Sequence, residues 1–370
     1  QNQQFPDDLT RQLRLKPGMI HDPRVLIEDE VTIGDYYERL GYRKAQIESS
    51  IEKKGDGLIV HYDLKKGEIA TIDSVEIAGA KFTKESLIRK RIGLKEGEIL
   101  NQDKIANAQK NLTDLRIFHQ VTVRAVPTPE DPNRYAVVAD LIERNHYELI
   151  YGIRYDTETD IGGEIQLTDL NLLGTGQTVS LYTRIHQQDQ LYRILYHSPT
   201  LSGLRWKTLI SASYERGNLL LLENDKFDGE RFDVTIQRQI NLGNDFLLIP
   251  GYQFEILTLI PLETPNINPV DGLKVSRFIG TLFRDSRDDP FNTKRGTFFS
   301  TDLQVATGWL GDVSYLKNYN QYIKILPYRK FTWASAVRVG LATDLPERVV
   351  TERFFAGGSF SIRGFKKDQV

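Results

Sequence analysis

The sequence predicts small α+β modules followed by a long antiparallel β region that forms either a transmembrane β-barrel or a soluble β-sandwich. Charged helical stretches and short strands alternate as far as Asn145. Beyond that residue the helical periodicity stops, and about eleven strand-like stretches follow one another. Each is about 8 to 13 residues long, which is the length that crosses a bilayer at a tilt.

Composition narrows the compartment and the class of partner. The net charge is −2, so a basic surface for nucleic acid is not indicated. There is no cysteine, which suits a periplasmic or outer-membrane protein and excludes disulfides and thiolate metal sites. The first residues, QNQQFPDD, lack the features of a signal peptide, so we expect any export signal to lie upstream.

Residues 70–145 predict one α+β module. A strand over residues 70–78 ends at Gly79, and Thr83 is the expected N-cap of a helix that ends at Gly93. Asn101 is the expected cap of a second helix, whose apolar residues recur on one face. Two strands, which begin near His119 and Tyr135, complete the order strand, helix, helix, strand, strand.

Residues 1–69 repeat this order without its opening strand. We expect helices over residues 6–15 and 23–40, then two strands paired around the turn at 55–57. The two modules therefore read as diverged repeats, the first of them partial.

The β region shows alternating faces. In the strand that begins at Trp206, Ile210 and Tyr214 lie on one side, while Lys207 and Ser211 lie on the other. Pro250 interrupts a similar strand, where it predicts a bulge or a local break because it has no N–H to donate. A soluble β-sandwich produces much the same alternation, so the pattern by itself leaves both folds open.

Three phrases carry a family resemblance: RFFAGGSFSIRGF over residues 353–365, DLNLLGTGQTVSLY over 169–182, and RDSRDDPFNTKRGTFFS over 284–300. Together with the tandem modules, they resemble the outer-membrane assembly-factor superfamily, whose barrels are of the BamA and TamA type. SIRGF and the RDDPFNTKRG turn incline the resemblance slightly toward the TamA type.

The resemblance implies POTRA modules, which are periplasmic polypeptide-transport domains, followed by a sixteen-stranded barrel with its arginine loop after the eleventh strand. The chain then comprises a partial POTRA-like domain at 1–69, a POTRA-like domain at 70–145, and the N-terminal part of a transmembrane β-barrel at 146–370. On this alignment it is truncated at both ends and lacks the last five strands.

The resemblance also implies three groups of site residues. The conserved loop folds into the barrel lumen, where its arginine pairs with acids on the strands after residue 370; its residues here are Gly357, Gly358, Ile362, Arg363, Gly364 and Phe365. The first barrel strand opens sideways as a lateral gate, and carries Tyr147, Leu149, Tyr151, Ile153 and Tyr155. The glycines of a tight periplasmic hairpin are Gly174 and Gly176.

Catalysis and metal binding have no supporting motif. The six histidines have no metal-site spacing, and no serine lies in a GxSxG phrase. The glycines near residue 174 precede a strand rather than a helix, which excludes a phosphate loop. Asp288 and Asp289 lack EF-hand spacing and predict a solvated turn. We expect no enzyme, no cofactor and no metal.

By resemblance, the leading hypothesis is a factor in the bacterial outer membrane that inserts β-barrel clients or translocates proteins through a lateral gate. Its expected partners are unfolded outer-membrane clients, the bilayer, and accessory subunits on the periplasmic POTRA domains, either lipoproteins or a TamB-like protein. Two alternatives stay open: a two-partner-type secretion pore for a dedicated substrate, and a soluble β-sandwich adhesin.

Overall fold

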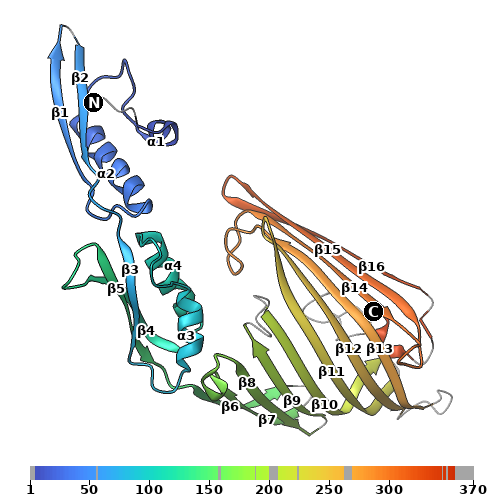
Figure 1. Cartoon of the computed structure of the whole chain (residues 1–370). Coiled ribbons are helices and arrows are strands. Elements are labelled where there is room, and N and C mark those ends of the chain that lie inside the picture. Colours follow the sequence, from blue (N-terminus) through green and yellow to red (C-terminus); the bar gives the residue numbers. More distant parts are fainter. Residues whose placement is uncertain are drawn as a thin grey trace. The chain divides into compact units, whose positions relative to one another are not determined.

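The structure is a computed structural model that describes residues 5–354, apart from residues 56, 157–159, 188, 200–206, 223–224, 262–268, 344 and 347–348. The chain divides into two compact units (Figure 1). The first contains Gln1–Asn145 and Leu173–Thr175, and the second contains His146–Leu172 and Gly176–Val370.

The first unit begins with a helical layer on a two-stranded sheet. Its elements are α1 (Asp7–Gln12), α2 (Pro23–Arg39), β1 (Gln46–Lys54) and β2 (Gly57–Lys65), and β1 pairs with β2 in antiparallel register. Leu9, Leu13, Ile33 and Tyr37 form the buried core between α1 and α2. The buried carboxylate of Asp29 accepts the Arg14 N–H at 2.7 Å and the Leu15 N–H at 3.0 Å. Because both amides bond to this side chain, α1 is shorter than the predicted helix over residues 6–15.

The same unit continues with a three-stranded module. Its elements are β3 (Thr71–Ala78), α3 (Glu85–Ile92), α4 (Gln102–Thr113), β4 (Phe118–Pro127) and β5 (Arg134–Glu143). β5 lies between β3, to which it is parallel, and β4, to which it is antiparallel. Its alternate residues from Tyr135 to Leu141 are buried in a core that includes α3 and α4. Gly79 ends β3 at a positive φ of 85°, where a Cβ would lie 1.9 Å from the Leu141 carbonyl oxygen.

One predicted helix cap is wrong and the other is confirmed. α3 begins at Glu85 rather than after Thr83, and its N-cap, Lys84, makes no side-chain capping bond. The Thr83 N–H instead donates to the carboxylate of Glu143 at 2.7 Å, and this contact holds Thr83 in the turn before the helix. In α4, the side chain of Asn101 accepts the Lys104 N–H at 2.9 Å, as predicted.

The second unit is one antiparallel sheet whose eleven described strands follow in sequence order from β6 to β16. Its strands are β6 (Tyr147–Asp156), β7 (Asp160–Asp169), β8 (Thr178–His186), β9 (Asp189–Ser198), β10 (Lys207–Leu222), β11 (Asp225–Gly243), β12 (Phe246–Pro261), β13 (Val270–Asp285), β14 (Gly296–Ala306), β15 (Tyr315–Tyr328) and β16 (Phe331–Ala342). The sheet curves in Figure 1. A sandwich would divide these strands between two sheets, so the soluble β-sandwich is wrong.

Several strands are longer than the predicted 8 to 13 residues. β10, β12 and β13 have 16 residues each, and β11 has 19. Alternation of apolar and polar residues does not show where a strand leaves the membrane, so the pattern does not determine the length of the strand. Pro250 lies opposite Gly280 of β13, and the pairs of its strand with β11 stop at Gly251 and resume at Leu248 in unchanged register. It therefore causes a local break rather than a bulge.

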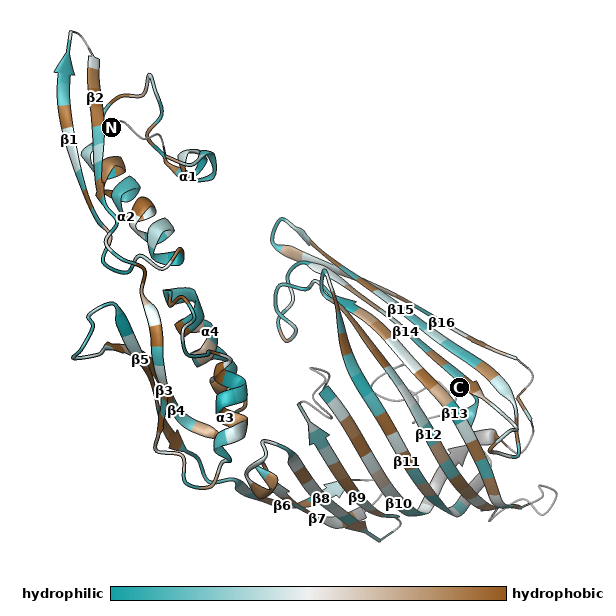
Figure 2. Cartoon of the chain, in the orientation of Figure 1, coloured by the Kyte–Doolittle hydropathy of each residue, from teal (hydrophilic) through white to brown (hydrophobic). Residues whose placement is uncertain are grey.

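The two faces of this sheet differ in polarity, and apolar segments alternate with polar ones along the strands in Figure 2. Many large apolar side chains on the outer face are exposed, among them Tyr151, Ile165, Ile194, Phe278 and Val337. The inner face carries charged side chains at the alternate positions. None of the helices among the described residues is long and apolar enough to cross a membrane.

Candidate functional site

The predicted gate residues lie together on one face of an edge strand. β6 is at one end of the sheet order and β16 is at the other. Tyr147, Leu149, Tyr151, Ile153 and Tyr155 alternate along β6 and are all more than half exposed. An edge strand presents backbone N–H and C=O groups that can pair with another strand. The gating role itself stays a prediction.

The predicted hairpin glycines adopt conformations that favour glycine. Gly174 has a φ of 71° and Gly176 has a φ of 68°, both in the left-handed region. The side chain of Asn171 accepts the Gly176 N–H at 2.7 Å and holds the turn. Within the first compact unit, the carbonyl oxygen of Gly174 accepts the N–H of Lys84 at 2.9 Å.

The six predicted residues of the arginine loop, Gly357, Gly358, Ile362, Arg363, Gly364 and Phe365, lie outside the described residues. The segment that leads to them is described as far as Phe354 and contains a short 3-10 helix, η3 (Val350–Glu352). This segment meets the inner face of the sheet at a group of charged residues that sequence analysis did not single out.

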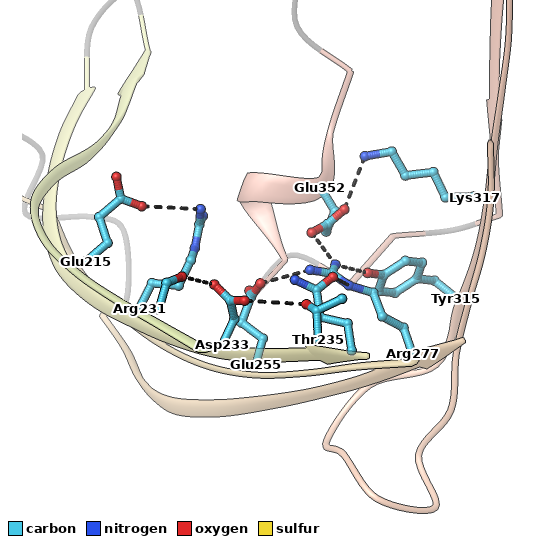
Figure 3. A network of polar contacts seen from close by, with 11 residues as sticks. Glu215, Arg231, Asp233, Thr235, Glu255, Arg277, Tyr315, Lys317 and Glu352 are labelled. Carbon is cyan, nitrogen blue, oxygen red and sulfur yellow. Dashed lines mark hydrogen bonds and ion pairs between the residues drawn. The ribbon is translucent and has the colours of Figure 1, made fainter. Parts of the chain in front are cut away.

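Arg277 of β13 is the centre of this group, and its guanidinium is almost fully buried (Figure 3). Its Nε donates to Gln253 Oε1 at 2.9 Å, and its Nη2 donates to Glu255 Oε2 at 2.8 Å. Its Nη1 donates to the hydroxyl of Tyr315 at 2.8 Å and to a carboxylate oxygen of Glu352. The guanidinium therefore joins β12, β13, β15 and η3, with each of its three nitrogens bonded to an acceptor.

Glu352 is the acid that η3 contributes. Besides Arg277, it accepts a hydrogen bond from Lys317 Nζ of β15 at 3.1 Å. Burial of Glu352 would raise the pKa of its carboxyl group, but the charges of Arg277 and Lys317 outweigh burial and lower the pKa below its ordinary value. Glu352 is therefore held as a carboxylate at neutral pH.

Further ion pairs continue along the inner face toward β8. Arg231 of β11 lies 3.8 Å from Glu215 of β10, which also lies 3.7 Å from Arg184 of β8. Arg184 is 2.6 Å from Asp189, and the same carboxylate lies 2.9 Å from Nδ1 of His186. Positive and negative side chains thus alternate across the concave face of the sheet.

The contacts around Arg277 hold the carboxylate of Glu352 in place. We call this group the clamp; its members are Gln253, Glu255, Arg277, Tyr315, Lys317 and Glu352. Arg277 is bonded to acceptors on all three nitrogens, and its two acids are paired with it. In the described part of the chain, no three His, Cys, Asp or Glu side chains are placed to hold a metal ion. The carboxylates of Asp288 and Asp289, whose spacing does not match an EF-hand, accept backbone N–H groups of their own turn.

A sequence signal for the clamp existed. Glu255 and Arg277 are single charges inside apolar runs, FEIL and SRFI, and a charge that faces a buried site needs a partner. That the two charges meet follows from the register of β12 and β13, which places Gln253 opposite Arg277 and Glu255 opposite Val275. The alternating pattern alone does not determine this register.

Comparisons with known proteins agree with this architecture. The model of the Omp85 superfamily domain matches residues 171–370, which is more than half of the chain. The chain belongs to the Omp85 superfamily. The POTRA model, described as a surface antigen variable number repeat, matches residues 2–67 and 70–144. The Omp85 and POTRA matches confirm the predicted class of POTRA-like modules followed by barrel strands.

Relatives at low identity extend the likeness. The chain is 23% identical over 362 residues to the outer membrane protein assembly factor BamA of Nitratidesulfovibrio vulgaris, and the match covers 94% of this chain and 44% of that protein. It is 22% identical to a SAM50-like protein of Schizosaccharomyces pombe, over 81% of this chain and 67% of the relative. The chain thus spans less than half the length of the BamA relative.

Solved structures show the same fold. BamA from Haemophilus ducreyi lacking POTRA domains 1–3 superposes with a TM-score of 0.78 and 14% identity, covering 98% of this chain and 73% of that one. CdiB from Acinetobacter baumannii gives a TM-score of 0.54 at 14% identity, covering 97% and 68%. The protein is an outer-membrane β-barrel protein with periplasmic POTRA domains.

Proposed function

We propose that the protein assembles other proteins into the outer membrane, by adding client β-strands to an edge of its barrel that opens sideways. The observation that carries this proposal is β6, an edge strand with a row of exposed apolar side chains on its outer face. A client strand that pairs with such an edge satisfies its backbone hydrogen bonds as it enters lipid. No covalent step, nucleotide or cofactor is required.

The division of labour follows the domain order. We infer a partial POTRA domain at 1–69, a second POTRA domain at 70–145, and the N-terminal part of the barrel at 146–370. The POTRA domains would receive unfolded outer-membrane clients and accessory subunits, either lipoproteins or a TamB-like protein. The family membership and the likeness to BamA support this assignment.

A cysteine lock tests the gate. The test places one cysteine at Gly152 in β6 and a second cysteine at the facing position in the last strand of the full-length barrel. The chain has no cysteine of its own that could pair with either of them. We expect the oxidised protein to lose insertion of β-barrel clients into liposomes, and reductant to restore it. Each single-cysteine variant is the control. Full insertion by the oxidised, locked barrel would overturn the lateral gate.

A secretion pore for a dedicated substrate is the second candidate, and the likeness of fold to CdiB supports it. The segment around η3 argues the other way, because Val349 packs into an apolar cluster with Leu257 and Leu273, and Glu352 occupies the clamp. A loop segment seated against the inner face reduces the free lumen. Large steady single-channel conductance of the full-length protein, with no client insertion, would favour the pore.

A further inference from the structure

The segment that precedes the arginine loop is attached to the inner face of the sheet at three points, and each uses a different kind of contact. The three points are an apolar contact at Val349, an ionic contact at Glu352 and an aromatic contact at Phe354. We call residues 349–354 the seat segment.

The apolar point is fully buried. Val349 packs with Leu257 and Leu259 of β12 and with Val275 of β13, and its own side chain is 1% exposed. Burial of the Val349 side chain anchors the segment, because this apolar surface stays out of water only while the segment remains in place.

The ionic point is the clamp described above. Glu352 reaches two cations on different strands, Arg277 on β13 and Lys317 on β15. Separation of Glu352 would leave Arg277 with Glu255 as its remaining acid, in a buried site where an unpaired charge is strongly disfavoured. The clamp therefore opposes release of the segment.

The aromatic point uses a glycine on the last described strand. A Cβ at Gly340 of β16 would lie 2.7 Å from the ring of Phe354. The ring fits against β16 because Gly340 has no side chain. The ring stacks on Tyr319 of β15 with centroids 6.3 Å apart, and Lys317 Nζ lies 5.1 Å from its centroid. The same lysine thus contacts two points of the seat segment.

We propose that the seat segment anchors the loop after β16 to the inside of the barrel independently of Arg363, as a second attachment whose partners all come from β12, β13, β15 and β16. Each of these partners is on a strand of this chain, whereas the resemblance assigns the acids for Arg363 to later strands. All the partners of the anchor therefore lie in the described part of this chain. It does not depend on the proposed insertion activity, because it concerns where the loop lies.

A thiol reporter tests this anchor. The hydroxyl oxygen of Thr351 is buried, and cysteine is close to threonine in size, so Thr351→Cys adds a single buried thiol to a cysteine-free background. The rate at which a bulky water-soluble maleimide labels this thiol, in the full-length protein in liposomes, reports release of the seat segment. Heat-modifiable migration verifies that each variant is folded.

In this background we expect Glu352→Gln to raise the labelling rate severalfold, because the neutral amide no longer pairs with Arg277 and Lys317. Lys317→Met should raise the labelling rate less, since the contact of Glu352 with Arg277 remains. If Glu352→Gln does not fold, Lys317→Met still tests the anchor, because it leaves Arg277 and its acids in place. The matched control is Arg353→Gln, an exposed neighbour whose change should leave the rate unchanged.

Arg363→Ala is the variant that distinguishes the two anchors. We expect it to leave labelling of the Thr351→Cys thiol within about twofold of the parent rate, whatever it does to client insertion. The proposal is overturned if Glu352→Gln and Lys317→Met both label at the parent rate. It is equally overturned if Arg363→Ala accelerates labelling as much as Glu352→Gln does.

Discussion

At the scale of single residues, buried charges position segments that lie far apart in the sequence. Arg277 joins Glu255 and Glu352, and all three side chains are almost fully buried. Loss of one member of a buried ionic group typically costs about 3 to 5 kcal/mol, because the remaining charges lose compensation. A well-packed apolar replacement of the entire group can be neutral, so the clamp is better understood as specifying which segment binds than as a source of net stability.

Glu143 performs a similar role in the second POTRA module. Its carboxylate accepts the backbone N–H groups of Lys81, Phe82 and Thr83 at distances from 2.7 to 3.2 Å. Partial burial would raise the pKa of its carboxyl group, but the bonds from Thr83, Phe82 and Lys81 outweigh burial and lower it. A lowered pKa means that the folded state favours the carboxylate.

We therefore predict a stabilising contribution of Glu143 that is present above about pH 4.5 and is lost as the pH falls through the lower folded-state pKa. Glu143→Gln should remove about 1 to 2 kcal/mol at neutral pH, because an amide is a weaker acceptor than a carboxylate. Hydrogen exchange at the Thr83 amide measures the loss. Glu96→Gln, on the same module and exposed, is the control. Equal protection in the two variants at pH 7 would contradict the prediction.

At the scale of elements, one glycine on β7 makes room for a buried histidine on β8. The ring of His186 lies over Gly162, where a Cβ would be 1.5 Å from a ring carbon. His186 is buried and lies beside Asp189, so its ring has little freedom to move aside. The adjacent Gly163 has no such neighbour, since its nearest contact would be the Gly152 carbonyl oxygen at 3.8 Å.

This pair gives a matched test of strand pairing. We predict that Gly162→Ala destabilises the barrel by about 1 to 3 kcal/mol, the usual cost of overpacking a closed site. Gly163→Ala should be tolerated, because alanine suits an extended strand better than glycine. The temperature of heat-modifiable unfolding distinguishes the two variants. A Gly162→Ala barrel as stable as the Gly163→Ala barrel would show that His186 moves aside.

At the scale of the whole molecule, the two faces of the sheet predict opposite responses to charge. Tyr322 lies on the outer face near the middle of β15, while its neighbour Gln321 lies on the inner face opposite Arg338. A lysine that faces the bilayer midplane costs about 2 to 4 kcal/mol, whereas a wetted lumen position tolerates charge.

We predict that Tyr322→Lys reduces folding of the full-length protein into liposomes and lowers its unfolding free energy by about 2 to 4 kcal/mol. Gln321→Lys should cost less than about 1 kcal/mol, chiefly through repulsion from Arg338. Urea titration of both variants in the same lipid compares the two faces directly. An equal loss in both variants would mean that the outer face of β15 does not contact lipid.

Much of this organisation was predictable from sequence. The change at residue 145 from helical to alternating periodicity separates the two kinds of domain, and the strand count agrees with the eleven described strands. The cap at Asn101 was predictable because the helix start and its cap are neighbours in the chain. Thr83 was misassigned because its partner, Glu143, is far along the chain and the helix start depends on that contact.

The sequence alone determined the periodicities, the local turns and the three phrases that carry the family resemblance, because each depends on residues within a few positions of one another. Only the tertiary structure decided which charges meet. The register of β12, β13 and β15, and the return of η3 to the inner face, bring Glu255, Arg277, Lys317 and Glu352 together. Such contacts form across distances in sequence that no local pattern records, because register and loop path are set by the packing of the whole sheet.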